Sequence, residues 1–360
     1  MAYTTINKST ANFNTLLYTA TGTQSVTGAG FQPDMAWVKP RSSAGSHYIA
    51  DAVRGATKTI SPNSTSAEGT QNLFTSFDSD GVSLGSDNWS DNRTAVIWNW
   101  KAGGTGSSNS DATGSYPITS TVSANQTAGF SIVKYTGNGY STATIGHGLG
   151  AKPACVIMRP LGYSGAWWIA HQNLIADNVL EFNTNAQANI SSFSGGGLKY
   201  STFTTSVIGG GNGSSNSGLW NGSGQNYIAY CFAEKTGYSR FGEYYGNGST
   251  DGTFVYTGFK PVWVMIKNKT SGSYKSWSIF DTTRQTSNPN VNKTLYANRN
   301  EPEGRRGDGS TSSTIPAIDM LSNGFKCRVL NDEVNTTNGY IYMAFGQSLV
   351  GSNNIPATAR

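Results

Sequence analysis

The sequence predicts an all-β protein made of three tandem antiparallel β-sandwich domains of the jelly-roll or lectin-like kind. Three observations support this prediction: one motif is written three times, the composition suits strands and turns, and the apolar runs are short. Of the 360 residues, 44 are glycine and only 12% are charged. Abundant Ser, Thr and Asn together with glycine are typical of short strands joined by polar turns.

The repeated motif is a Gly three residues before a Pro, then five mostly apolar residues and a closing cation. It occupies residues 30–39, 150–159 and 258–267, so its Pro recurs after 120 and then 108 residues. Each spacing matches an ordinary small domain. The apolar run suits a strand covered on both faces, with the Pro at its first position, where a missing N–H is tolerated. We expect the closing cation to emerge into solvent.

The other elements of each copy recur in the same order. Each copy opens on a Tyr and a Gly-rich turn, continues through the motif to a second short strand, and ends on an apolar strand. The second short strands are expected at 48–51, 168–171 and 278–281, and the closing strands at 94–100, 227–233 and 340–345. No window of a dozen residues keeps apolar positions at helical spacing, so helix should be nearly absent.

Domain boundaries follow from these copies. We expect β-sandwich repeats at residues 1–103, 128–236 and 237–347, with a Gly/Ser/Thr-rich linker at 104–127 and a C-terminal arm at 348–360. The linker composition is that of a flexible chain. Because only about five residues join the second and third repeats, these two should form a rigid pair, with the first more loosely attached.

Charge and hydropathy exclude several classes of function. The net charge of +5 comes from 25 basic and 20 acidic residues without a basic cluster beyond Arg305-Arg306, so nucleic-acid binding has little support. No apolar segment approaches the roughly 20 residues that span a bilayer, and the N-terminus lacks the features of a signal peptide. We therefore expect no membrane insertion and folding in a cytoplasm.

Cysteine and histidine usage predicts neither metal nor cofactor. The cysteines lie within expected strands, and their odd number and wide spacing argue against a disulfide framework or a zinc site. We expect buried thiols. The three histidines lie in different segments. The residues concerned are Cys155, Cys231, Cys327, His47, His147 and His171.

One repeated polar position resembles a catalytic site without its partners. Asp51, His171 and Asp281 are equivalent, and an Asp-x-x-Arg sequence occurs in the first and third copies. Catalytic carboxylates need a second group at a defined distance, and none recurs. We interpret the motif as a structural turn and predict no catalytic residues.

Aromatic side chains are the remaining candidates for ligand binding. Trp89, Trp220 and Tyr274 stand in the least apolar contexts, so they are our candidates for a surface on which sugar rings could stack. Packing in the core or in an interface is the alternative for each. They lie in or near the loops where the copies differ, around Trp89, 209–220 and 272–274, and we expect function there.

The sequence also resembles a known group of proteins. The strings Phe31-Gln-Pro-Asp-Met-Ala-Trp-Val-Lys39, Ser76-Phe-Asp-Ser-Asp-Gly-Val-Ser-Leu-Gly85 and Val96-Ile-Trp-Asn-Trp-Lys-Ala-Gly103, with related strings in the other copies, are similar to those of repeat proteins found widely in marine bacteriophages. Those proteins are associated with virions or tails. The resemblance covers nearly the whole chain and implies a virion component, assembled in the host cytoplasm, without implying an activity.

Three functions remain open at this point. The first is a tail fibre or tail appendage that contacts a host surface glycan or protein and assembles with other virion proteins and with copies of itself as a homotrimer. The second is a capsid decoration or head-fibre protein. The third, a glycan-cleaving enzyme of the tailspike kind, is disfavoured by the scarcity of acids.

Overall fold

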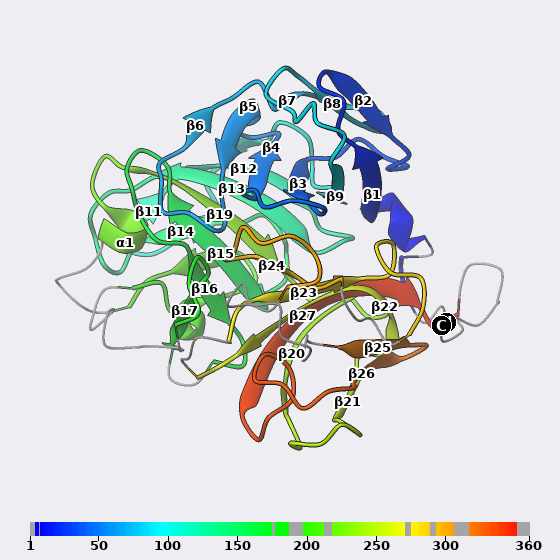
Figure 1. Ribbon diagram of the computed structural model, residues 1–360. Helices are drawn as coiled ribbons and strands as arrows, with labels where there is room; N and C mark the ends of the chain where they lie inside the picture. Colours follow the sequence, from blue (N-terminus) through cyan, green and yellow to red (C-terminus); the bar gives the residue numbers. More distant parts are fainter. Residues whose placement is uncertain are drawn as a thin grey trace.

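The chain folds into three units of paired β-sheets. The structure is a computed structural model that describes residues 4–6, 8–174, 177–186, 197–211, 218–270, 275–288, 293–305 and 317–350. Unit 1 contains strands β1 to β9, unit 2 contains β10 to β19, and unit 3 contains β20 to β27. Figure 1 shows them as a blue, a cyan-to-green and a yellow-to-red lobe that meet at a shared centre.

Each unit has one large sheet, in which strands distant in sequence lie side by side. In unit 1 the spatial order is β1 (Phe13–Thr19), β9 (Thr94–Trp100), β3 (Met35–Pro40), β4 (Tyr48–Asp51), β5 (Gly55–Ile60) and β6 (Gly69–Thr70). In unit 2 it is β10 (Ser107–Asn109), β12 (Ser120–Asn125), β13 (Phe130–Thr136), β19 (Asn226–Phe232), β15 (Cys155–Pro160), β16 (Trp168–His171) and β17 (Val179–Glu181). In unit 3 it is β20 (Ser239–Tyr245), β27 (Gly339–Ser348), β22 (Phe259–Asn268), β23 (Ser278–Asp281) and β24 (Leu295–Tyr296).

A small sheet covers the outer face of each large one. The small sheets are β2 (Gln24–Thr27), β8 (Gly81–Leu84) and β7 (Phe74–Asp78) in unit 1, β11 (Pro117–Ile118), β14 (Thr144–Gly146) and β18 (Val207–Gly209) in unit 2, and β21 (Phe254–Tyr256), β26 (Gly324–Cys327) and β25 (Ile318–Leu321) in unit 3. Helix is limited among the described residues to the short turns η1 (Ser9–Ala11), η4 (Tyr200–Thr202) and α1 (Gly218–Asn221).

The four central strands of the large sheets correspond between units. The order β1-β9-β3-β4 in unit 1 is repeated as β13-β19-β15-β16 in unit 2 and as β20-β27-β22-β23 in unit 3. These strands pair antiparallel, and among the described strands only β11 pairs parallel, with β14. The expected all-β fold of antiparallel sheets is therefore confirmed.

The apolar run of the repeated motif is continuous because its successive side chains point alternately into two different cores. In β3, Met35 and Trp37 point into a core shared by all three units, whereas Ala36 and Val38 point into the core between the two sheets of unit 1. Because successive side chains of a strand point to opposite faces, a strand buried on both faces needs apolar residues at every position. The three large sheets thus pack face to face at the centre, and the units do not rely on separate cores alone.

Residues 104–127 differ from the expected flexible linker. They contribute β10, β11 and β12 to the two sheets of unit 2, and β12 pairs with β13 over six positions. Ile118, Ser120 and Val122 are buried at alternate positions, so this Ser/Thr-rich segment has the period of a half-buried strand. The proposed boundaries at 103 and 128 therefore cut a segment that belongs to unit 2. At the C-terminus, β27 continues to residue 348, and residues 351–360 of the expected arm lie outside the described residues.

Candidate functional site

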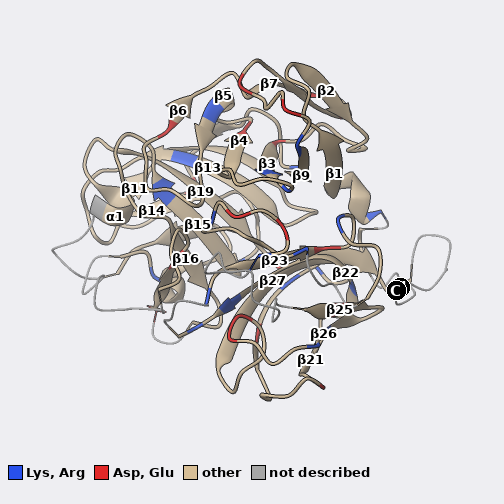
Figure 2. Ribbon diagram, in the orientation of Figure 1, with Lys and Arg blue, Asp and Glu red and all other residues tan. Residues whose placement is uncertain are grey.

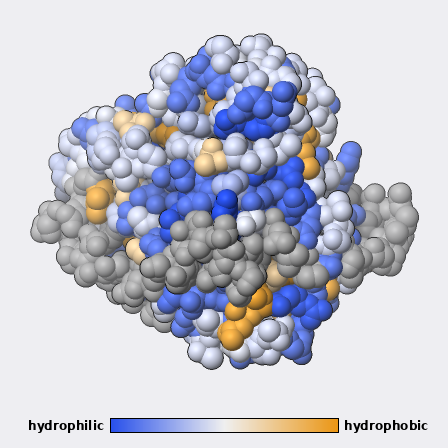
Figure 3. Space-filling view, viewed as in Figure 1, coloured by the Kyte–Doolittle hydropathy of each residue, from blue (hydrophilic) through white to orange (hydrophobic). Residues whose placement is uncertain are grey.

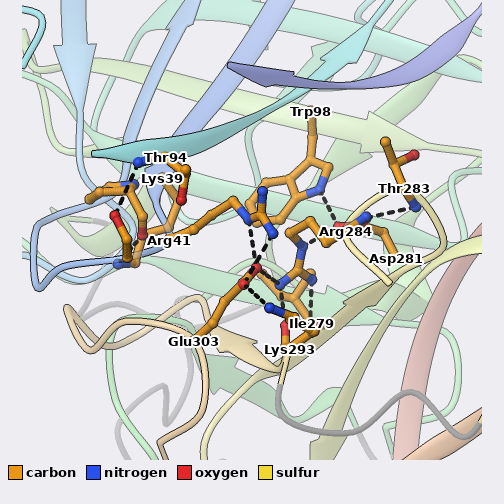
Figure 4. Close-up of polar contacts among 12 residues, drawn as sticks. Lys39, Arg41, Thr94, Trp98, Ile279, Asp281, Thr283, Arg284, Lys293 and Glu303 are labelled. Carbon is orange, nitrogen blue, oxygen red and sulfur yellow. Dashed lines mark hydrogen bonds and ion pairs between the residues drawn. The ribbon is translucent and has the colours of Figure 1, made fainter. Parts of the chain in front are cut away.

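A buried ion-pair cluster lies where unit 3 meets unit 1 (Figure 4). Asp281, the last residue of β23, accepts hydrogen bonds at Oδ1 from the backbone N–H groups of Thr283 and Arg284, at 3.1 and 2.8 Å. Its Oδ2 binds Nε of Arg284 and accepts a hydrogen bond from Nε1 of Trp98, on β9 of unit 1, at 3.0 Å. The Asp-x-x-Arg pair thus closes a turn and also holds a side chain of the neighbouring unit.

Glu303 joins this cluster to a second residue of unit 1. Its Oε1 lies 3.2 Å from Nη1 of Arg284, and both carboxylate oxygens accept from Arg41, at 2.8 and 3.2 Å. A two-pronged arginine–carboxylate contact fixes direction as well as distance. The side chains of Arg284 and Glu303 are 0% and 8% exposed, so water has little access to their charges.

The junction between units 1 and 2 repeats this arrangement. Asp51 accepts at Oδ1 from the backbone N–H of Arg54 at 2.9 Å and pairs at Oδ2 with Nε of Arg54. Here the donor from the neighbouring unit is the hydroxyl of Tyr230, 2.7 Å from Oδ2. Glu68 pairs with Nη1 of Arg54 at 3.0 Å, as Glu303 does in the other cluster. Burial alone lowers the pKa of Arg54. The combined effect of Asp51, Tyr230 and Glu68, which raise it, is larger, so the pKa of Arg54 lies above its usual value.

At the third junction, between units 2 and 3, the repeated turn position carries no charge. Nδ1 of His171 accepts from the backbone N–H of Asn173 at 3.2 Å, so the proton resides on Nε2, which faces the carbonyl oxygen of Tyr342 at 3.3 Å. Leu174 takes the place of the arginine. Burial lowers the pKa of His171 to about 4, which keeps the ring neutral near pH 7. In all three units, the side chain at the repeated position thus accepts backbone N–H groups of a turn.

A second set of contacts closes the ring of units. Three ring nitrogens at equivalent positions, directly before β4, β16 and β23, each donate to a backbone carbonyl of a neighbouring unit. They are Nε2 of His47 to Tyr296 at 2.8 Å, Nε1 of Trp167 to Ser61 at 2.9 Å, and Nε1 of Trp277 to Glu181 at 3.3 Å. Nδ1 of His47 accepts from Trp37, so its Nε2 is the protonated nitrogen. Each unit therefore binds both others, and the expected loose attachment of the first repeat is wrong.

The cations that close the repeated motif are buried instead of emerging into solvent. Lys39, Arg159 and Lys267 are each 0% exposed, and each donates to the carbonyl of the residue that follows it. Lys39 also donates to the carbonyl of Asn300 in unit 3, and Arg159 to that of Ser66 in unit 1. At Lys39 and Arg159, a loop of the neighbouring unit therefore covers the strand end that we expected to be free. Burial lowers the pKa of Lys39 and Lys267 to about 7 and that of Arg159 to about 10.

Of the three aromatic residues expected at a binding surface, the two that the structure describes, Trp89 and Trp220, do not form one. Trp89 is half-buried, and its ring lies against Tyr48 at 6.4 Å and beneath the guanidinium of Arg93 at 5.4 Å. Trp220 is 0% exposed in the sandwich core of unit 2, so the expectation of a surface residue is wrong there. Its indole occupies the space that a side chain at Gly210 would need. Tyr274 lies outside the described residues.

Exposed aromatic side chains gather at one side of unit 3, and a separate exposed pair, Tyr116 and Tyr140, stacks in unit 2 with ring centroids 3.7 Å apart. Tyr245 on β20 is 63% exposed, and Phe254 and Tyr256 on β21 are 43% and 54% exposed. β20 and β21 are the edge strands of the two sheets of unit 3, and a groove of about 320 Å³ lies between them. In Figure 3 most of the visible surface is hydrophilic, and the most extensive apolar area lies over unit 3. Alternation in Phe-Val-Tyr, with Val255 buried, is the sequence signal that would have identified these residues.

The rest of the described surface carries no concentrated charge. Figure 2 shows basic and acidic residues interspersed along the three units. Within the described ranges, no three His, Cys, Asp or Glu side chains are grouped as metal ligands would be. The three cysteines are free and buried, as expected. No helix in this part of the chain has the length and apolarity needed to cross a bilayer.

Comparison with known proteins assigns the chain to a family. No curated protein and no solved structure was found to match it. A family model described as Domain of unknown function (DUF7483) matches residues 8–348. That range begins just before η1 and ends with β27, so it includes all three units. The chain belongs to the DUF7483 family.

Proposed function

We propose that this protein is a structural component of a bacteriophage virion, located in a tail fibre or tail appendage that contacts the host surface. The observation that carries the proposal is the use of the repeated polar residues: at the described junctions, the repeated turn position of each copy binds a neighbouring unit. A scaffold of this kind holds loops and strand edges in fixed positions, which is what an attachment protein requires. The resemblance to repeat proteins of marine phages also supports a role in the virion.

The environment of the repeated acids supports the proposal of a non-catalytic role. Asp51 and Asp281 are each 0% exposed, and each is occupied by an arginine and by a donor from another unit. A carboxylate that acts on a glycan must reach the scissile bond with a second carboxyl group a few ångströms away. We therefore propose that the protein does not cleave glycans. Release of oligosaccharides from envelope glycans of the host by the purified protein would overturn this part of the proposal.

Location on the particle is the decisive test. A cryo-electron microscopy reconstruction of the virion that carries this chain should show its three-lobed density at the tail. Density repeated over the capsid lattice would refute the tail assignment and favour the decoration or head-fibre alternative. Absence of the chain from purified virions by mass spectrometry would refute both.

The proposed partners are other virion proteins and copies of the chain itself. A homotrimer remains our proposal for the assembled state, and three-fold geometry already exists inside one chain through the ring of units. Native mass spectrometry of the purified protein tests the trimer, because one chain has a mass of 38.2 kDa. A species of a single chain at all concentrations would refute it. A host ligand, glycan or protein, is proposed to bind the exposed loops and edges.

A further inference from the structure

The groove of unit 3 lies between two strand edges. β20 is the outer strand of the large sheet and β21 is the outer strand of the small sheet. The floor includes Gly242, at which an added side chain would meet the ring of Tyr342. Gln172 and Asn173 of unit 2 close one end. The sandwich of unit 3 is thus open along the side where its two sheets end.

The equivalent side of unit 2 is closed by the chain itself. There, β11 pairs with β14, and β12 pairs with β13, so the segment from 117 to 125 bridges the two sheet edges. The backbone N–H of Thr144 donates to the carbonyl of Tyr116 at 3.4 Å, and the hydroxyl of Ser120 donates to the carbonyl of Gly146 at 3.0 Å. Ile118 is buried in the core between the sheets. An extended segment with alternating small and apolar residues therefore fits this kind of groove.

The backbone of β21 presents the same groups as β14. Thr253 accepts from Cys327 of the inner strand, and the backbone N–H of Thr257 donates to Asn323 on the same side. Because successive residues of a strand direct their N–H and C=O groups to opposite sides, those of Phe254 and Tyr256 point toward the open edge. Their register places Phe254 where Thr144 stands in unit 2 and Tyr256 where Gly146 stands.

The large-sheet edge is occupied at Phe241 and again at Tyr245, whose carbonyl accepts from the Thr253 hydroxyl at 2.8 Å, and is open only between them. The carbonyl of Phe241 accepts from the side-chain amide of Gln172, and its N–H donates to Glu234 at 2.9 Å. The same alternation turns the backbone groups of Glu243, two residues along β20, toward the groove side. An incoming strand would therefore pair mainly with β21 and reach β20 only near Glu243.

We propose that the groove between β20 and β21 binds an extended polypeptide segment, which adds a strand to β21 in parallel as β11 does to β14. Exposed strand edges are templates for such addition, in which main-chain hydrogen bonds give affinity and pockets for alternate side chains give selectivity. The segment should carry a β-branched apolar residue that enters the gap between the sheets, flanked by Ser or Thr. This inference does not depend on the location of the protein in a virion.

The segment of unit 2 provides the probe. A fluorescent peptide with the sequence of residues 115–125 is titrated with the full chain and followed by fluorescence anisotropy. The internal copy stays in unit 2 because its effective concentration there far exceeds that of the peptide. We expect saturable binding below about 1 mM, and a scrambled peptide should bind at least about tenfold more weakly. No saturation up to that concentration overturns the proposal.

Two substitutions of one residue separate strand addition from stacking of a sugar ring. Phe254→Pro removes an N–H that points outward, at an edge position where proline is tolerated, and should weaken peptide binding at least about tenfold. Phe254→Val keeps the N–H but removes the aromatic ring, and should stay within about threefold of wild type. Equal loss in both variants contradicts main-chain pairing and indicates that the aromatic face is the binding element, as for a glycan.

A modified peptide gives the same answer without altering the protein. Methylation of the backbone nitrogen at the position of Ile118 removes the donor that parallel pairing directs at the carbonyl of Phe254. We expect this peptide to lose binding to the wild-type chain. If it binds as well as the unmodified peptide, strand addition to β21 is refuted, whatever the folding of the proline variant.

Discussion

Removing the carboxylate of Asp281 tests whether the repeated turn holds the units together. Its side chain and that of Arg284 are both 0% exposed. The substitution Asp281→Ala leaves the guanidinium buried without this partner, deprives two backbone N–H groups of their acceptor, and removes the acceptor of the Trp98 indole. Breaking a buried pair by deleting one member costs about 3–5 kcal/mol, and because Glu303 still pairs with Arg284 we expect the lower end of that range. That is a large part of the stability of a typical folded chain.

The chain contains its own compatible replacement. At the junction of units 2 and 3, His171 and Leu174 occupy the positions of the Asp and the Arg. The double variant Asp281→His with Arg284→Leu removes both charges together, and Glu303 keeps its contacts with Arg41. What remains is the Trp98 N–H without its acceptor, an expected cost of about 1–3 kcal/mol, and the loss of the donor that Arg284 supplies to the carbonyls of Ile279 and Lys293. We therefore expect the double variant to be more stable than Asp281→Ala.

Guanidinium unfolding measures both variants. Tryptophan fluorescence and far-UV circular dichroism should give coincident transitions, which justifies a free energy of unfolding by linear extrapolation. The control is Asp91→Ala, which removes a surface pair with Arg93 whose side chains are 53% and 20% exposed, and which should leave the midpoint close to wild type. A double variant as unstable as Asp281→Ala would show that the burial of an unpaired charge is not the source of the loss.

Three further predictions concern groups that the junctions and strand ends bury. Burial lowers the pKa of Lys267 from 10.5 to about 7, so between these pH values the unfolded chain holds a proton that the folded chain lacks. The free energy of unfolding of wild type, relative to that of Lys267→Met, should therefore rise between pH 7 and 9, by up to about 1.4 kcal/mol per pH unit. Burial likewise lowers the pKa of His171 from 6.5 to about 4, so the free energy of unfolding should fall as pH falls through that range, and less so in His171→Asn. Equal losses of the free energy of unfolding in the two proteins between pH 6.5 and 4.5, measured by urea titration, would contradict this. Trp167→Phe keeps a six-membered aromatic ring but removes the pyrrole ring with the N–H that binds Ser61. Loss of the hydrogen bond alone should lower the free energy of unfolding by about 0.5–2 kcal/mol, and the lost packing of this buried side chain adds to it, so an unchanged midpoint would mean that this contact does not support the ring of units.

The sequence was sufficient for the strands because their signals are local. Continuous apolar runs such as Met35 to Val38 indicate burial on both faces, and the structure places those faces against two different cores. The turn role of Asp51 and Asp281 followed from their position after a short strand. A repeated motif therefore reveals which residues share an environment, even when the environment itself is unknown.

The environment could not be derived because it depends on contacts between units. Lys39 and Arg159 are cations at strand ends, which are usually solvated, and only the neighbouring loops that supply carbonyl acceptors make their burial tolerable. Trp220 stands among Gly, Ser and Asn, and only the missing side chain of Gly210 gives its indole a place in the core. Residues 104–127 have the Gly- and Ser-rich composition of a linker. Their composition was a stronger signal than the alternation of residues that the structure shows to be buried, so the strands were missed.

The differences between the three junctions explain how similar units keep one order. Trp98, Tyr230 and Met343 stand at equivalent positions of β9, β19 and β27, as their pairing with β3, β15 and β22 shows. Two of them can donate a hydrogen bond to a buried carboxylate, and the third cannot. Where the methionine stands, the facing unit has His171 in place of an aspartate and uses the carbonyl of Tyr342 as its acceptor. An aspartate placed opposite the methionine would lack its donor, at the cost of an unsatisfied buried charge. The loss of the Asp, the Arg and the donor at a single junction is thus one coordinated change, and it specifies which unit follows which around the ring.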